Sequence, residues 1–267
     1  MKKLVKLNTA RNCLRYIIRA YNINTIYVPH YICPSIKSTL KKEIVNVEYY
    51  HIDERFMPTC KFKPKDYILY PNYFGICTNN VKELEKQYKN LIVDNSHAFY
   101  AEPRGLASFN SLRKFFQMQY GVLDGAYLYT EKIMERPFRT ADDYEIEENM
   151  TYERIVKNEH RLDNEQIMYM SKTTEKIMSG INFQQEKLIR MNNYKKFEEK
   201  LKATNELAIS TDKNEYPFVY PYYTHDKEFG YNLEKQGMLI YRYWDGIPPN
   251  FEEYNFYKYL VPIPLNF

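Results

Sequence analysis

Three side chains in the first half of the chain have types and a spacing that suit chemistry on a carbonyl group. Lys114 lies in the segment SFNSLRKFFQMQYGVLDG, between two stretches expected to be strands, and Asp94 and His97 precede it in VDNSHAF. A lysine becomes a nucleophile when burial or nearby positive charge lowers its pKa, and it then forms a Schiff base with an aldehyde. Arg113 is placed to supply such a positive field. The alternative for Lys114 is a solvated lysine in a turn.

Asp94 ends the apolar run NLIVD, where a carboxylate is costly unless a cation accompanies it. A protonated pyridine nitrogen is one such cation, and the pairing keeps the ring an electron sink. The combination predicts pyridoxal 5'-phosphate (PLP) as the cofactor, with Lys114 bound to its aldehyde. His97 could lie over the ring or contact its phenolate oxygen. The alternatives are that Asp94 caps the following turn and that His97 is hydrogen-bonded inside the core.

A phosphate site is expected at the start of the first helix, in the segment NTAR. The backbone N–H groups of Thr9 and Ala10 would point out of that helix end, where the helix dipole favours an anion. Ser108 and Ser111 are further hydroxyl donors to phosphate, of which only one need be used. An ordinary helix N-cap at Thr9 remains the alternative.

Two more positions are candidates for contact with the cofactor. Asn72, in YPNYFG, could reach the cofactor or the substrate. His30 and Tyr31 follow an expected strand, and Tyr31 is our candidate for a ring that stacks on the pyridine. All three are equally compatible with places in the core or in loops.

The first half of the sequence alternates short apolar runs with helical patterns. This order indicates an α/β fold with a mostly parallel sheet and flanking helices. In such sheets ligands bind at the carboxyl ends of strands, where Thr9, Pro29, Asn72 and Asp94 would gather. We expect helices at 10–20, from residue 34, and at 81–88, and strands at 25–28, 46–52, 66–71, 90–94 and 125–130.

The second half has a different character. Residues 142–165 are acidic and polar, which suits a mobile loop or a solvated helix, and 171–203 are mostly helical with an interruption at Gly180. After residue 215, prolines separate aromatic, strand-like pieces, and these predict a small α+β unit. We therefore expect a large PLP-binding α/β domain at 1–185 and a small C-terminal domain at 186–267.

Composition excludes several classes of protein. The 38 basic and 34 acidic residues leave a net charge of only +4. No basic block with interleaved aromatics suggests binding of nucleic acid. We expect neither a signal peptide nor a membrane span, because no apolar run is long enough. The four cysteines are dispersed without metal-ligand spacing, so we expect reduced thiols, no metal and a cytoplasmic location.

Taken in order, these segments resemble the PLP-dependent fold-type-I aminotransferases of the DegT/StrS-like sugar aminotransferase family. The chain differs from the family pattern in having Asn8 where a glycine is usual, no arm before the first helix, and Cys33 near the usual aromatic position. It has no clear counterpart of the asparagine segment that reaches the neighbouring subunit, so it would be a shortened member. The matching segments are NTARNCLRYII, VPHYICPSI, YPNYFGICTNNVKELEKQY, LIVDNSHAFYA, SFNSLRKFFQMQYGVLDGAYLYT, LIRMNNYKKFEEKL, GMLIYRYWDG and LVPIPL.

The resemblance implies a function and roles for residues. Lys114 would be the lysine joined to PLP, Asp94 the partner of the pyridine nitrogen, and His97 a neighbour of the ring. The protein would be a homodimer that moves an amino group from an amino acid, glutamate in the family, to a keto sugar. That sugar would be nucleotide-linked and would serve surface polysaccharide or amino-sugar biosynthesis. A PLP-dependent sugar dehydratase and a non-catalytic paralogue acting as a scaffold or partner are the alternatives.

Overall fold

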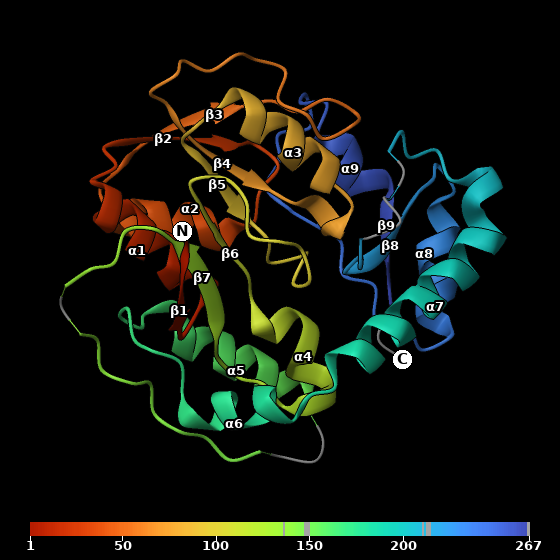
Figure 1. Cartoon of the computed structure of the whole chain (residues 1–267). Coiled ribbons are helices and arrows are strands. Elements are labelled where there is room, and N and C mark those ends of the chain that lie inside the picture. The colour runs from red at the N-terminus through yellow and green to blue at the C-terminus, as the bar shows by residue number, and fades with distance from the viewer. Residues whose placement is uncertain (136, 147–149, 210, 212–214, 266–267) are drawn as a thin grey trace.

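A computed structural model of the chain describes residues 1–135, 137–146, 150–209, 211 and 215–265. Within these residues a seven-stranded sheet with helices around it forms the larger part, and a two-stranded sheet with its own helices lies to one side (Figure 1). None of the described helices is long and apolar enough to cross a membrane.

The large sheet is mixed but mostly parallel, as predicted. Its strand order is β1-β7-β6-β5-β4-β2-β3, and only β7 runs antiparallel to its two neighbours, β1 and β6. The short strands β1 and β6 were not predicted as separate elements, and β1 pairs with β7 at the edge. The strands are β1 (Lys3–Leu7), β2 (Thr25–Pro29), β3 (Asn46–Tyr50), β4 (Tyr67–Pro71), β5 (Leu91–Asp94), β6 (Ala107–Phe109) and β7 (Ala126–Thr130).

Helices cover both faces of this sheet. The helices α1 (Ala10–Tyr21) and α2 (Pro34–Lys42) pack against one face, and α3 (Thr78–Gln87) packs against the other. Neighbouring residues of β5 alternate between the two cores, since Ile92 belongs to the first and Val93 to the second. Asp94 therefore shares the face that α1 covers. The expected helices at 10–20, from 34 and at 81–88 are confirmed to within a turn.

Three further helices lie at the lower end of Figure 1, below the large sheet. They are α4 (Leu112–Tyr120), α5 (Tyr152–Asp163) and α6 (Lys172–Gly180). The acidic stretch that suited either a loop or a solvated helix thus contains the helix α5. Lys114 lies on α4 between β6 and β7, so its backbone is fixed by a helix and not by a turn.

The second sheet follows the long helix α7 (Phe183–Leu201). The strands β8 (Val219–Tyr223) and β9 (Leu260–Pro264) pair antiparallel, and α8 (Lys227–Lys235) and α9 (Tyr254–Tyr259) accompany them. Two short 3-10 helices complete the order, η1 (Tyr73–Gly75) after β4 and η2 (Lys202–Thr204) after α7. This unit combines helices and strands, as predicted for the last part of the chain. The division at 185/186, inside the first turn of α7, stays a prediction.

The tail of the chain, residues 215–265, also returns to the large sheet. Trp244 is buried in the core that β4, β5 and α3 share, and Phe218 donates its backbone N–H to the Phe74 carbonyl at 2.8 Å. The turn that receives this bond contains Gly75, whose φ is +76°. A Cβ atom at Gly75 would lie 2.4 Å from the carbonyl oxygen of His97. Only glycine lets this turn approach the backbone of the 94–97 segment so closely.

We expect Gly75→Ala to lower the free energy of unfolding by about 2 kcal/mol, because both the positive φ and the backbone clash oppose a side chain. Urea unfolding followed by circular dichroism measures the change. Gly180→Ala is the matched control, since a Cβ there meets nothing within 4 Å, and it should be neutral or stabilising by up to about 1 kcal/mol. Equal stability of Gly75→Ala and the native chain would contradict the role of this turn.

Candidate active site

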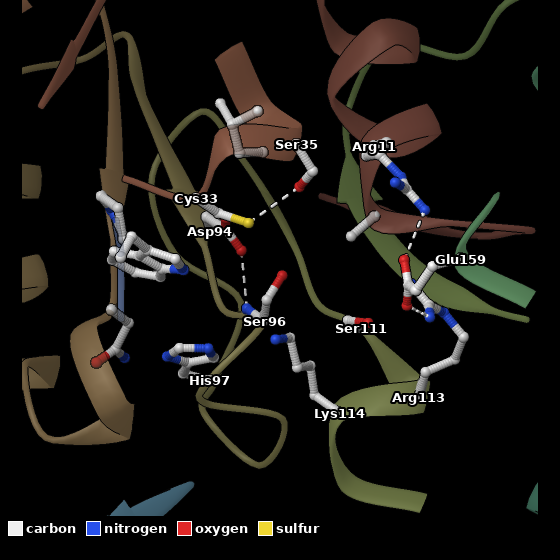
Figure 2. A pocket seen from close by; sticks show the side chains of 15 residues that line it. Arg11, Cys33, Ser35, Asp94, Ser96, His97, Ser111, Arg113, Lys114 and Glu159 are labelled. Atoms are coloured by element: carbon white, nitrogen blue, oxygen red, sulfur yellow. Dashed lines mark hydrogen bonds and ion pairs between the residues drawn. The ribbon is translucent and has the colours of Figure 1, made fainter. Parts of the chain in front are cut away.

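A cavity of about 190 Å³ lies at the carboxyl ends of the central strands, between the starts of α1, α2 and α4 (Figure 2). It receives side chains from segments far apart in the sequence, including the end of β5 and the tail of the chain. Its lining consists of Ala10, Arg11, Cys33, Ser35, Ile36, Pro71, Asn72, Asp94, Ser96, His97, Ser111, Arg113, Lys114, Glu159 and Trp244.

Lys114 projects into this cavity from the first turn of α4 (Figure 2). Its Nζ lies 5.4 Å from the centre of the Tyr243 ring and 5.9 Å from that of Phe218. Within the described part of the chain, no hydrogen bond or ion pair ties down this amine. Its positive charge nevertheless acts on Asp94 and His97. The amine thus lies beside aromatic rings, and no described side chain would compete with a ligand for it.

Asp94 ends β5 and faces the same cavity. One of its carboxylate oxygens accepts the Ser96 backbone N–H at 2.8 Å, so the Asp also caps a turn, as the alternative interpretation had it. Burial raises the pKa of Asp94, although the bonds from Ser96 and the charge of Lys114 act in the opposite direction. The carboxylate therefore sits where a further cation would stabilise it.

His97 is enclosed by aromatic rings. It stacks on Phe218 with ring centres 4.7 Å apart, on Trp244 at 5.6 Å and on Phe74 at 5.8 Å, and the planes differ by 20°, 20° and 30°. Burial lowers the pKa of His97 well below its ordinary value, and the charge of Lys114 lowers it further. The imidazole is consequently neutral at physiological pH, and the surrounding rings fix it at the border of the cavity.

The first turn of α1 opens onto the opposite end of the cavity. Thr9 is the N-cap, and its Oγ1 accepts the Asn12 N–H at 3.1 Å. Ala10 and Arg11 line the cavity, and the N–H groups of a first helical turn have no partner within their own helix. Thr9 itself is buried behind them and does not line the space. Its contribution is to fix the helix start.

Two guanidinium groups and one carboxylate lie beside this helix start. Arg113, from α4, and Arg11, from α1, both form ion pairs with Glu159 of α5, the latter at 3.2 Å (Figure 2). Arg11 also pairs with Asp163, one turn further along α5. Burial raises the pKa of Glu159, but the charge and hydrogen bond of Arg113 more than offset this and hold it below its usual range. Glu159 is therefore ionised at neutral pH.

The structure brings most of the predicted residues to this one cavity. Lys114, Ala10, Asp94 and His97 line it, and so does Ser111, the N-cap of α4.

Asn72 also lines the cavity, but its side chain is engaged in the turn that follows β4. It donates to Thr78 and Asn95 and accepts the Cys77 N–H at 3.0 Å. Its position therefore has a structural explanation.

Two predicted contacts are placed elsewhere. Tyr31 is fully buried beneath the site, where its hydroxyl donates to the Tyr243 carbonyl and its ring packs on Tyr73, so it is not available to stack in the cavity. Ser108 lies in the middle of β6, whose neighbours Ala107 and Phe109 face the α1 side. It therefore faces the other side of the sheet, away from the cavity, because side chains of a strand alternate.

Among the lining residues that no sequence pattern pointed to, two matter most for the site, Trp244 and Glu159. Trp244 lines the cavity and packs on Tyr31, so the ring that faces the space comes from the tail of the chain and not from the segment after β2. The sequence has one tryptophan, which was a usable signal. Glu159 carried none, because it lies in a polar, acidic stretch without a motif.

The donor set fits PLP. The N–H groups of Ala10 and Arg11 at the start of α1, with the Arg11 and Arg113 side chains, suit a phosphate, and the buried Asp94 suits a protonated ring nitrogen. The amine of Lys114, which has no bonding partner among the described residues, suits an aldehyde, and the aromatic side chains around His97 and Trp244 suit a flat heterocycle. A second, larger cavity of about 700 Å³ opens beside Lys114 and has space for a substrate.

Comparison with known proteins identifies the architecture. Neither models of protein families nor curated protein sequences match this chain. Solved structures do: the aminotransferase TlmJ of Streptoalloteichus hindustanus has a TM-score of 0.67 at 12% identity, over 98% of this chain and 80% of that one. The chain has the fold of the fold-type-I aminotransferases.

Two further structures with this aminotransferase fold cover nearly the whole chain. Helicobacter pylori PseC, an aminotransferase of pseudoaminic acid biosynthesis, has a TM-score of 0.64 at 15% identity over 99% of this chain and 81% of its own. Spr1654 of Streptococcus pneumoniae is described as a sugar aminotransferase and was solved in a PLP form. It has a TM-score of 0.65 at 12% identity, over 99% of this chain and 82% of its own. Such identities establish the fold, and function rests on the site.

We expect Asp94→Asn to stabilise the cofactor-free chain by about 1 kcal/mol near pH 7.5. Because burial raises the pKa of Asp94 in the folded state, ionisation above the unfolded pKa of about 3.9 destabilises the fold. The amide removes that charge and keeps an oxygen for the Ser96 N–H. The gain should shrink as the pH falls toward the unfolded pKa of about 3.9 and vanish only well below it, where the carboxyl is protonated in both states.

Urea unfolding at about pH 7.5 and pH 4.5 measures this difference. Asp245→Asn, at an exposed position, is the control and should change stability little at either pH. A loss of stability in Asp94→Asn near pH 7.5 would mean that the attraction of Lys114 outweighs burial.

Proposed function

We propose that the protein is a PLP-dependent aminotransferase. It would take an amino group from an amino acid, glutamate by resemblance, and transfer it to a nucleotide-linked keto sugar. The observation that carries this proposal is the placement of Lys114 and Asp94 in one cavity at whose far end the first turn of α1 opens.

Each group of the cofactor has a counterpart in the cavity. Arg11, Arg113, the Ala10 N–H and Ser111 would hold the phosphate, and Asp94 would keep the ring nitrogen protonated. The ring would lie among the aromatic side chains that enclose His97. When bound, PLP supplies an electron sink that stabilises negative charge on the substrate carbon next to nitrogen.

The chain's own contribution to the reaction centres on Lys114. Once released, its amine would act as base and then as acid, moving a proton between the substrate carbon and the cofactor carbon. Its position in the first turn of α4 and its lack of a hydrogen bond among the described residues leave it room to swing. His97, neutral and fixed by stacking, would not compete with it for the proton.

The substrate would enter through the larger cavity. This space shares Ser111, Arg113, Lys114 and Glu159 with the smaller one, so a ligand in it would meet the reactive amine directly. The structural neighbours described as acting in amino-sugar chemistry favour a keto sugar as the acceptor. We further propose a homodimer and a cytoplasmic location, the latter because the four cysteines are free thiols.

We expect Lys114→Ala to reduce transamination from glutamate by about three orders of magnitude or more, because the proton-transferring amine is lost. The measurement follows 2-oxoglutarate formed from glutamate in the presence of PLP. Lys176→Ala, at an exposed site on α6, is the matched control and should retain native turnover.

A second readout separates cofactor binding from turnover. The native protein is incubated with PLP, reduced with borohydride and digested, and the labelled peptide is identified by mass. The label should be on Lys114 and absent from Lys114→Ala. Label on another lysine, or near-native turnover in Lys114→Ala, would overturn the proposed role.

A further inference from the structure

The helix α5 places a carboxylate where the cofactor phosphate is proposed to bind. Glu159 projects from α5 into the cavity and lies between the guanidinium groups of Arg11 and Arg113 (Figure 2). These two arginines come from α1 and α4, the helices whose first turns border the site. Their shared partner is thus supplied by a third element, 45 residues beyond Lys114.

Arg113 needs an anion at this place, and Arg11, whose other partner is Asp163, shares that anion. Their side chains retain only 12% and 13% of their exposure, so neither charge can be fully solvated by water. The first turn of α1 adds the N–H groups of Ala10 and Arg11, which have no partner within their own helix, and the positive end of its dipole. Glu159, ionised because Arg113 offsets the effect of its burial, satisfies this positive region in the unliganded chain.

We propose that Glu159 is an internal competitor for phosphate at the site formed by Arg11, Arg113 and the first turn of α1. This inference rests on the proposed function in identifying the phosphate as that of PLP. Glu159 holds the two arginines in place until a phosphate arrives, and it then withdraws. The two anions cannot share the site, because like charges a few ångströms apart in a partly buried place repel strongly. The carboxylate therefore weakens phosphate binding.

The attachment of α5 permits this exchange. Of the described side chains of α5, only Asn158 and Leu162 are buried, and the remainder are half-buried or exposed. Asn158 anchors the helix through a bond from its Nδ2 to the Leu123 carbonyl at 2.7 Å. Asp163 keeps Arg11 paired when Glu159 leaves. A change of rotamer at Glu159 is thus sufficient, and the helix itself need not unfold.

The test compares Glu159→Gln with the native chain in calorimetric titrations with inorganic phosphate and, separately, with PLP. We expect the dissociation constants for both to fall at least about tenfold in Glu159→Gln, because a repelling charge is removed. Glu153→Gln is the matched control. It removes the same charge from an exposed position on the same helix and should change either constant less than about twofold.

Glu159→Asp keeps the charge but shortens the side chain, so it should bind phosphate only slightly more tightly than the native chain. Thermal melts establish that each variant is folded. Should Glu159→Gln unfold, Glu159→Ser and Glu159→Ala take its place, with the same expectation.

The outcomes separate this inference from the proposed function. Tighter phosphate binding in Glu159→Gln together with PLP label on Lys114 supports both. Tighter phosphate binding without any PLP label supports the competitor and overturns the cofactor. PLP label on Lys114 with unchanged dissociation constants in Glu159→Gln overturns the competitor and leaves the proposed function standing. Unchanged constants and no label overturn both.

Discussion

The burial of the Asp94 carboxylate is the constraint on which the site depends. An ionised group at the end of a central strand is tolerated only when hydrogen bonds and opposite charge compensate for lost water. Here the Ser96 N–H and the charge of Lys114 do so in part, and the pKa of Asp94 stays raised. The site is therefore incomplete as an electrostatic system, and a cationic ring nitrogen would complete it. The charge of Asp94 that destabilises the empty chain is the same charge that would bind the ring nitrogen of the cofactor.

Aromatic stacking joins the first half of the chain to its tail beside that carboxylate. His97 follows Asp94 by three residues, yet its ring is held by Phe218 and Trp244, which belong to the tail. Gly75 makes the contact possible, because the turn it occupies passes directly against the His97 backbone. The small C-terminal unit is thus a wall of the site and not an appendage. Displacing that unit would expose the amine of Lys114 to water.

Local signals in the sequence predicted the elements that local physics determines. The helix from Ala10 to Tyr21 and the strand ending at Asp94 follow from apolar periodicity and capping. The alternation of strands and helices along the chain predicted a site at the carboxyl ends of the strands. Contacts between distant segments were beyond that reasoning. Trp244 lines the cavity where Tyr31 was expected to do so, because which ring faces the space depends on how the tail packs. Whether Ser108 can reach a phosphate depends on which side of the sheet it faces, and no sequence pattern marks the pleat of a three-residue strand.

The charges of the unliganded cavity form two groups that mirror the charges of PLP. At one end a carboxylate, Glu159, occupies the place between Arg11 and Arg113 that suits a phosphate. At the other end the Lys114 amine gives Asp94 the nearby positive charge that a pyridinium would supply. Each substitute comes from the chain itself and lowers the cost of the buried charges, fully between Glu159 and Arg113 and only in part at Asp94, whose pKa stays raised. A ligand that carries both charges at once can displace both substitutes, whereas inorganic phosphate displaces only one. Discrimination in favour of the whole cofactor then follows from how the chain compensates its own charges.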